Sequence, residues 1–216
     1  MESSEIPNNK LILGIPCETH PEERMVSLVP QNVAALKELG VEVLIENNAG
    51  IKAGFNNQQY EDAGASILTS RTEIFNSANV IAQVRGPSKN PESGQKDIAN
   101  LGDTHIIIGF LHPHFSINEM HQIAQKGTTS IAMELIPRIT KAQNMDALSS
   151  LANLAGYKSV LLAASVMPKI FPLMMTASGT IRPAKILVLG AGVAGLQAIA
   201  TAKRLGALVT GYDIRP

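Results

Sequence analysis

Apolar and polar residues alternate along this chain in two periods, one typical of buried strands and one typical of helices. From Leu11 onwards, short β-rich apolar runs alternate with segments in which apolar residues recur every three or four positions. The pattern predicts strands over 11–16, 41–47, 79–84, 104–111 and 129–135, and helices over 30–39, 58–64 and 117–127. Such alternation builds a parallel sheet covered on both faces, so we expect a doubly wound α/β domain.

A long apolar segment and a second strand–helix–strand pattern follow. The segment 147–165 carries apolar residues at helical spacing and predicts a long connecting helix. After a stretch of small residues, the sequence predicts a strand over 185–189, a helix that ends at Leu205 and a strand over 207–212. The expected fold class is α/β, with two Rossmann-like doubly wound domains of which the second stops after its first βαβ unit.

These patterns predict four segments of the chain. We expect a disordered tail over 1–10, an N-terminal α/β domain over 11–145, a connecting helix and linker over 146–182, and the start of a nucleotide-binding Rossmann domain over 183–216. One βαβ unit cannot cover both faces of its own sheet. We therefore expect the chain alone to bind a dinucleotide weakly or not at all, and to expose Leu196, Ile199 and Leu205 on its last helix.

Charge and composition exclude several classes of partner. Lys+Arg and Asp+Glu each number 18, so no basic excess indicates nucleic acid or an anionic membrane as a ligand. Apolar runs such as 106–111 fall well short of the roughly 20 residues that span a bilayer, and the first ten residues lack the features of a signal peptide. The single cysteine, Cys17, fits a reducing compartment and a small core residue, and we expect no metal site.

A glycine-rich turn carries the strongest chemical signal. Gly190, Gly192 and Gly195 follow the strand at 185–189 in G-x-G-x-x-G spacing and open a helix, and Asp213 ends the next strand. Glycines there permit a tight turn and let a pyrophosphate approach the backbone closely, so that the helix amides can bind its charge. Asp213 is placed to accept hydrogen bonds from ribose hydroxyls, and its charge repels a 2′-phosphate. The predicted cofactor is NAD, and its expected binding residues are Gly190, Gly192, Val193, Ala194, Gly195 and Asp213. The alternative is that the glycines serve only the turn and the helix packing.

A polar loop between two apolar elements forms the second candidate. Arg138, Gln143 and Asp146 lie five and three residues apart after the strand predicted at 129–135, so their side chains could converge on one cleft. Each also has a purely structural interpretation. Asp146 could cap the helix that begins at Ala147, and Arg138 could be a solvated surface charge.

Three stretches of the chain resemble a known family. They are MELIPRITKAQNMDALSSLANLAGYKSV at 133–160, FPLMMTASGTIRPAKILVLGAGVAGLQAIATAKRLGA at 171–207 and the opening LILGIPCETHPEERMVSLVP. They look like the α-subunit, domain I, of proton-translocating NAD(P) transhydrogenase. The resemblance implies hydride transfer from NADH held here to NADP⁺ held by a partner domain. It also implies that the chain forms a homodimer, and that membrane-spanning partner subunits hold this dimer at the cytoplasmic side of the inner membrane.

The same resemblance assigns roles to the polar loop. In that family an arginine, a glutamine and an aspartate surround the nicotinamide, and this carries over to Arg138, Gln143 and Asp146, the expected catalytic residues. Arg138 and Asp146 would orient the ring and its carboxamide, and Gln143 would face the partner's cofactor. Further candidates, which could equally be packing or capping residues, are Glu134, Ser149, Ser150 and Tyr157.

Alanine dehydrogenase shares this architecture and is the alternative enzyme. It needs an arginine, a lysine and a histidine, but the matching positions here hold Met25 and Arg85, with His112 in the histidine position. Arg24 is one residue away from the arginine position, and Arg85, unlike lysine, cannot act as a base. A third possibility is a non-catalytic remnant that keeps the architecture without the activity.

Overall fold

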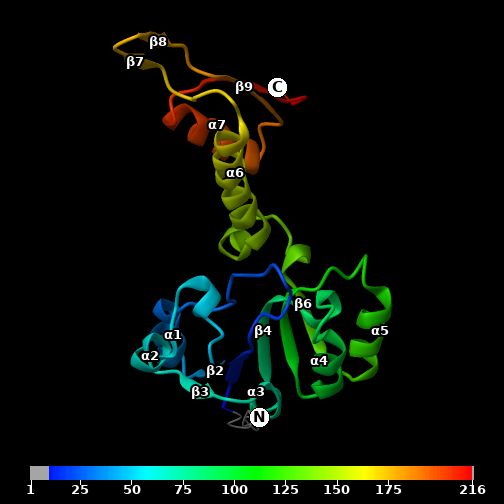
Figure 1. Cartoon of the computed structure of the whole chain (residues 1–216). Helices are drawn as coiled ribbons and strands as arrows, with labels where there is room; N and C mark the ends of the chain where they lie inside the picture. The colour runs from blue at the N-terminus through cyan, green and yellow to red at the C-terminus, as the bar shows by residue number, and fades with distance from the viewer. Residues whose placement is uncertain (1–9, 216) are drawn as a thin grey trace. The chain divides into compact units, whose positions relative to one another are not determined.

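The computed structural model describes residues 10–215 and divides the chain into two compact units (Figure 1). The first unit runs to Ile136 and the second begins at Pro137. The loop before the long helix therefore groups with that helix, whereas the boundary expected from the sequence assigns it to the first domain. The expected tail at 1–10 lies outside the described residues except for Lys10.

A six-stranded parallel sheet with the order β3-β2-β1-β4-β5-β6 forms the centre of the first unit. The order reverses between β1 and β4, which is the point where such sheets open a crevice at the carboxyl ends of their strands. The strands are β1 Ile12–Ile15, β2 Glu42–Glu46, β3 Ser66–Leu68, β4 Val80–Arg85, β5 Ile106–Phe110 and β6 Thr129–Ala132. The helices are α1 Pro30–Glu38, α2 Asn57–Asp62, α3 Arg71–Ser77, α4 Gly94–Asn100 and α5 Ile117–Gln125, with short 3₁₀ turns η1 Ile51–Ala53, η2 Pro87–Lys89 and η3 Met133–Leu135.

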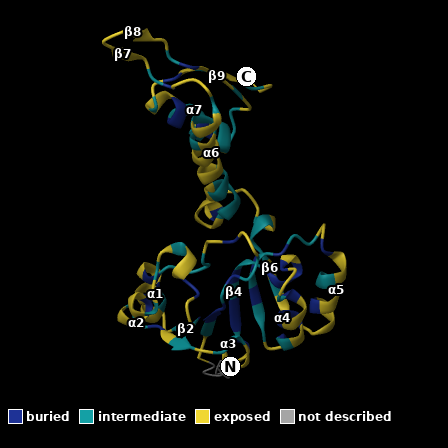
Figure 2. Ribbon diagram, viewed as in Figure 1, coloured by how far each residue is buried: buried dark blue, intermediate teal, exposed yellow. Residues whose placement is uncertain are grey.

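Both faces of this sheet are buried, as the near-continuous apolar runs predicted. Successive side chains of a strand point to opposite faces, and β2 shows the consequence. Val43 and Ile45 pack into one core with Tyr60 of α2, while Leu44 between them packs into the other core with Phe75 of α3. Figure 2 shows the central strand β4 largely dark blue and the outer sides of the helices yellow. The doubly wound α/β class is confirmed for this unit.

Three elements of the first unit were missed by the sequence analysis, and the strand predicted over 129–135 was too long by three residues at its end. The missed elements are β3, α3 and α4, which are short and carry few apolar residues. The strand expected over 129–135 ends at Ala132, because the chain turns into η3 at Met133. This turn carries the chain off the sheet before the polar loop begins.

The second unit contains a long helix, a hairpin and a βαβ unit. The helix is α6 Ala147–Val166, preceded by the 3₁₀ segment η4 Thr140–Met145. An antiparallel hairpin of β7 Met174–Thr176 and β8 Gly179–Ile181, which was not predicted, follows it. The parallel strands β9 Lys185–Leu189 and β10 Leu208–Tyr212 flank helix α7 Val193–Arg204, so the predicted Rossmann-like βαβ unit is confirmed.

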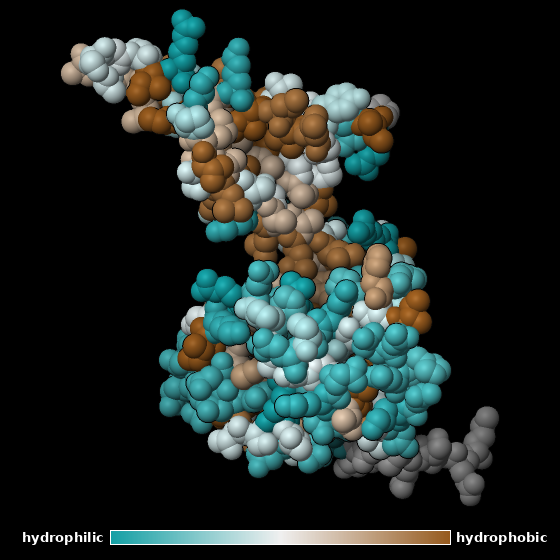
Figure 3. All heavy atoms as spheres, turned by 45° about the vertical axis from the view of Figure 1, so that its right-hand side comes forward, coloured by the Kyte–Doolittle hydropathy of each residue, from teal (hydrophilic) through white to brown (hydrophobic). Residues whose placement is uncertain are grey.

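Much of the apolar surface of the second unit faces outward. Its core joins Val160, Phe171, Ala184 and several alanines of α7 and its ends. Figure 3 shows apolar side chains spread over this unit, and those most exposed along α6 are Leu154, Leu162 and Val166. Of the residues expected to be exposed on α7, Leu196 is exposed while Ile199 and Leu205 are half-buried. No helix within residues 10–215 has both the length and the apolarity to cross a bilayer.

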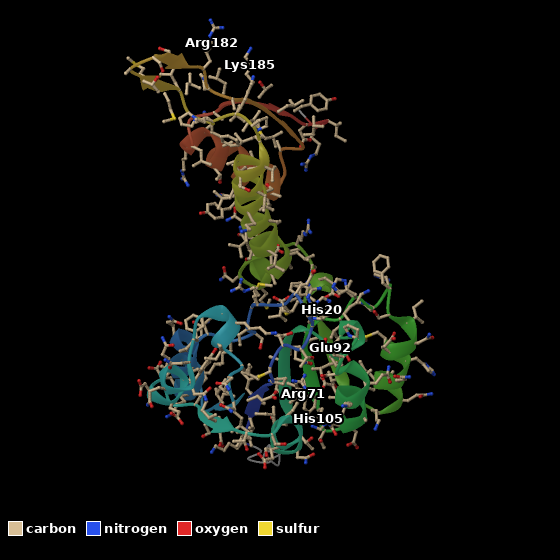
Figure 4. The ribbon with its side chains drawn as sticks, viewed as in Figure 1. His20, Arg71, Glu92, His105, Arg182 and Lys185 are labelled. Carbon is tan, nitrogen blue, oxygen red and sulfur yellow. The ribbon has the colours of Figure 1, made fainter. Side chains whose placement is uncertain are left out.

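A buried ion pair joins α3, α4 and the ends of β1 and β2. Arg71 donates from Nε and Nη2 to the two carboxylate oxygens of Asp97, each at 2.7 Å, and Asp97 is fully buried. Arg71 Nη1 also donates to the carbonyl of Cys17 at 2.8 Å and to Glu46 at 3.1 Å. Figure 4 labels Arg71 within the first unit. Cys17, expected in the core, is half-buried, and burial raises the pKa of its thiol to about 11.

We predict that Asp97→Ala lowers the free energy of unfolding by about 3–5 kcal/mol, because it leaves the Arg71 charge buried without its partner. The measurement is urea unfolding followed by circular dichroism. The control is Glu42→Ala, which breaks the pair that Lys10 forms with Glu42 at 2.7 Å on the surface. Glu42→Ala should lower the free energy of unfolding by about 1 kcal/mol or less. Equal losses in the two variants would contradict the prediction.

Candidate dinucleotide-binding site

The glycine-rich turn joins β9 to α7 through two distinct uses of glycine. Gly190 has a φ of +93°, a conformation that side chains rarely adopt. At Gly195 an added Cβ would lie 1.7 Å from the carbonyl oxygen of Gly190, so only glycine lets the first turn of α7 approach the end of β9. The turn is thus tight because of both residues.

The N-terminus of α7 is open to an anion. Gly192 occupies the N-cap and offers no side-chain acceptor, so no cap side chain competes for the amides of the first turn, at Val193, Ala194 and Gly195. A Cβ at Gly192 would meet only the tip of Arg215, at 4.0 Å. Free amides at the positive end of a helix, approached over glycine, are the groups that bind a pyrophosphate. The residues present fit that group.

Asp213 lies beside this turn, as its spacing predicted. Its Oδ2 accepts a hydrogen bond from the amide of Ala191 at 2.7 Å, which ties the end of β10 to the glycine-rich turn. Arg215 donates to Oδ1 from its backbone amide at 2.9 Å and from Nε at 3.2 Å. These Arg215 contacts, followed by the Ala191 amide, hold the pKa of Asp213 well below its usual range. The carboxylate is ionised and can accept hydrogen bonds from ribose hydroxyls.

The polar loop brings its three predicted residues together. Arg138, Gln143 and Asp146, with Ile139 and Thr140, line one hollow with a volume of about 300 Å³. Asp146 is also the N-cap of α6, since it accepts from the amide of Ser149 at 2.9 Å and from its hydroxyl at 2.6 Å. Ser149 and, more weakly, the charge of Arg138 lower the pKa of Asp146. The capping interpretation and the shared hollow therefore both hold.

Helix α6 connects the polar loop to the glycine-rich turn. At Gly156 an added Cβ would lie 2.1 Å from the carbonyl oxygen of Ala194, so the backbones of α6 and α7 touch there. Gly156 is ten residues beyond Asp146 (156 − 146), about 15 Å along the helix axis. One rigid helix thus carries the polar loop at its start and the glycine-rich turn against its middle. The sequence analysis missed Gly156, because a lone glycine in a helix gives no signal of its partner.

The further candidates divide between the two units. Ser149 holds Asp146, and Ser150 donates to the carbonyl of Asp146 at 3.2 Å, so both act at the start of α6. Tyr157 is 47% exposed on α6. Glu134 belongs to the first unit, where it accepts from the amides of Leu111 and His112.

The family model of the alanine dehydrogenase/PNT N-terminal domain matches residues 14–155, and that of the C-terminal domain matches 159–216. The chain belongs to the alanine dehydrogenase/PNT family. It is 41% identical over 204 residues to the NAD(P) transhydrogenase subunit alpha of Cereibacter sphaeroides, covering 94% of this chain and 38% of that protein. The chain thus spans well under half the length of this relative.

Two solved structures of the family share the fold of this chain. The transhydrogenase of Sinorhizobium meliloti is 44% identical with a TM-score of 0.89, over 95% of this chain and 59% of that one. An L-alanine dehydrogenase is 28% identical with a TM-score of 0.79, over 95% of this chain and 55% of that one. Sequence and fold are both more similar to the transhydrogenase.

Two of the positions that alanine dehydrogenase chemistry would need, those of Met25 and Arg85, lie at the carboxyl ends of β1 and β4, here called the β1/β4 edge, while His112 follows β5. Met25 is 36% exposed, and Arg24 is exposed beside it. Arg85 donates from Nε to Glu23 at 2.9 Å, and Glu23 is buried and accepts the amides of Arg24 and Met25. The guanidinium of Arg85 is thus already paired with the carboxylate of Glu23.

A second carboxylate closes the same edge. Glu18 is 6% exposed and accepts from the amides of Val84 and Arg85, the latter at 3.1 Å. Burial raises the pKa of Glu18 to about 7.

In the described part of the chain no group of three His, Cys, Asp or Glu residues could hold a metal ion.

We predict that Gly156→Ala loosens the contact between α6 and α7. The methyl group meets backbone rather than a movable side chain, which costs about 1–3 kcal/mol and exceeds the gain of at most about 1 kcal/mol in helix propensity. Hydrogen exchange of the α6 and α7 amides measures the loss. Asn153→Ala, an exposed change three residues earlier on α6, is the control and should leave exchange unchanged or slower. Unchanged exchange in Gly156→Ala would show that the close approach is dispensable.

We also predict a pH-dependent contribution from Glu18. Its folded-state pKa of about 7 exceeds the ordinary value of 4.5, so its contribution to stability is fully present below about pH 4.5 and is lost as pH rises through 7. Relative to Glu18→Gln, the wild-type chain should lose about 3 kcal/mol over that window, measured by urea unfolding at several pH values. Glu61→Gln, at an exposed position of α2, should keep the wild-type pH profile. A flat difference between wild type and Glu18→Gln would contradict the raised pKa.

Proposed function

We propose that this chain is the NAD(H)-binding component of a proton-translocating NAD(P) transhydrogenase. The observation that carries the proposal is that one helix, α6, joins the hollow lined by Arg138, Gln143 and Asp146 to the open glycine-rich turn. The two halves of a dinucleotide need such a pair of subsites on a rigid frame. The identity of 41% and 44% to named transhydrogenases supports the same assignment.

The glycine-rich turn and the polar loop bind different parts of the cofactor. The amides of Val193, Ala194 and Gly195 bind the pyrophosphate, and Asp213 binds the adenosine ribose. At the other end, Arg138 and Asp146 orient the nicotinamide and its carboxamide. Gln143 faces the NADP(H) that a partner domain holds. Bound NADH supplies the hydride, so these side chains contribute position rather than acid–base chemistry.

Alanine dehydrogenase activity is the second candidate, since an L-alanine dehydrogenase has the same fold. An amino-acid substrate needs a free cation for its carboxylate and a base for its amine. At the β1/β4 edge, Arg85 is paired with Glu23 and cannot be a base, and Met25 replaces the arginine. The contacts of this edge therefore favour the transhydrogenase.

Partner subunits complete the proposed activity. An NADP(H)-binding component accepts the hydride, and a membrane-spanning component couples the transfer to proton movement and holds this chain at the cytoplasmic side of the membrane. The chain pairs with a second copy. Exposed apolar side chains of the second unit support that pairing, among them Leu162 and Val166 of α6 and Met175 of the hairpin.

We predict that Gln143→Ala and Asp146→Asn slow hydride transfer by about tenfold to a hundredfold, because each loosens the position of the nicotinamide. Asparagine is used at Asp146 because it retains the N-cap of α6. The assay joins the 216-residue chain to the remaining C-terminal region of the Sinorhizobium meliloti relative, mixes it with an NADP(H)-binding component, and follows NADH-dependent reduction of a thionicotinamide analogue of NADP⁺.

The matched control is Asn144→Ala, an amide in the same 3₁₀ segment that does not line the hollow. It should transfer hydride at the wild-type rate. Wild-type rates in both Gln143→Ala and Asp146→Asn would remove the polar loop from the mechanism. Formation of NADH from L-alanine at about 1 s⁻¹ or faster would instead establish the dehydrogenase.

A further inference from the structure

Arg215 is the residue at the glycine-rich turn to which neither the sequence motif nor the proposed function gives a role. Its guanidinium approaches both oxygens of Asp213, with Nε 3.2 Å from Oδ1 and Nη2 3.4 Å from Oδ2. Nη2 also lies 4.0 Å from the position that a Cβ on Gly192 would take. The guanidinium therefore stands over the N-cap of α7, beside the carboxylate that would bind the ribose.

This ion pair can open without a large rearrangement. The Arg215 side chain is 73% exposed and that of Asp213 is 16% exposed, so water screens the attraction and can replace it. A guanidinium has a planar fork of donors that matches a phosphate as well as a carboxylate. Within residues 10–215, the only ion pair that Asp213 forms is the one with Arg215. Asp213 and Arg215 thus form a pair of opposite charges beside the glycine-rich turn.

We propose that Arg215 is a latent receptor for a ribose 2′-phosphate, and that Asp213 keeps it neutralised so that the site prefers NAD(H) to NADP(H). This rests on the proposed function only in taking the glycine-rich turn as the adenine-nucleotide site. Asp213 then acts twice against a 2′-phosphate. It repels the phosphate charge, and it occupies the Arg215 guanidinium that would bind that charge.

The two effects of Asp213 are separable by substitution. Asp213→Asn removes the repulsion and also frees Arg215, so it should reverse the preference rather than merely abolish it. If Arg215→Gln is added, the repulsion is still absent but the receptor is gone, and no preference should remain. The difference between these two variants isolates the contribution of Arg215.

The test titrates the 216-residue chain with adenosine 5′-monophosphate and with adenosine 2′,5′-bisphosphate, which differ only in the 2′-phosphate. Nuclear magnetic resonance follows the amide of Gly192 and the Nε–H of Arg215, which permits weak affinities to be measured. Wild type should prefer the monophosphate. Asp213→Asn should prefer the bisphosphate, with the ratio of the two affinities shifted by about tenfold or more, as expected for a gained charge-assisted hydrogen bond. Asp213→Asn/Arg215→Gln should bind both nucleotides equally.

The control for general electrostatics is Arg182→Gln in the Asp213→Asn background. Arg182 is an exposed arginine directly after β8 that projects outward in Figure 4, and its loss should leave the preference for the bisphosphate intact. An equal preference for the bisphosphate in Asp213→Asn and in the double variant would overturn the role of Arg215 while leaving the nucleotide site in place. No shift of the Gly192 amide with either nucleotide in any variant, both in the 216-residue chain and in the joined protein of the hydride-transfer assay, would overturn the site itself, and the proposed function with it.

Discussion

The second unit depends on backbone contacts that only glycine allows. At Gly156 the helix α6 touches the carbonyl of Ala194 in the first turn of α7, with no room for a methyl group. Such packing fixes two backbones relative to each other, because no flexible side chain separates them. Gly195 makes a second close approach, to the carbonyl of Gly190, which brings the end of β9 against the start of α7. Everything that α6 carries, including the polar loop that leads into it, is therefore held in register with the glycine-rich turn.

In the first unit, the place where the strand order reverses, between β1 and β4, is occupied by side chains of the chain itself. Glu18 and Glu23 direct their carboxyl groups inward at the β1/β4 edge, where both accept backbone amides and Glu23 also pairs with the guanidinium of Arg85. Parallel sheets commonly bind ligands at such an edge because its amides and cations are free. Here the chain satisfies them itself. The chain therefore fills the carboxyl ends of β1 and β4 with its own carboxyl groups. At the end of β9, by contrast, glycines leave the backbone amides free for a ligand.

Sequence reasoning found what local patterns encode and missed what distant contacts decide. The glycine spacing and Asp213 are local, and their geometry at the turn follows from a strand, a turn and a helix. Elements α3 and α4 escaped because their helical residues are mostly polar, and they are held by the buried pair of Arg71 and Asp97, which lie 26 residues apart. The hairpin β7–β8 escaped because its turn residues also fit a linker. The contact of Gly156 with the carbonyl of Ala194 is likewise set by the fold.

The polar residues of the second unit serve the fold and the candidate site with the same atoms. Asp146 caps α6 through both of its oxygens, and Asp213 accepts from Ala191 at Oδ2 and from Arg215 at both oxygens. Each carboxylate is thus positioned before any ligand arrives, which lowers the entropy lost on binding. It also means that a ligand at Asp213 must share or displace Arg215. The preference of the site is then set by the balance between two charges of the chain, and not by the carboxylate alone.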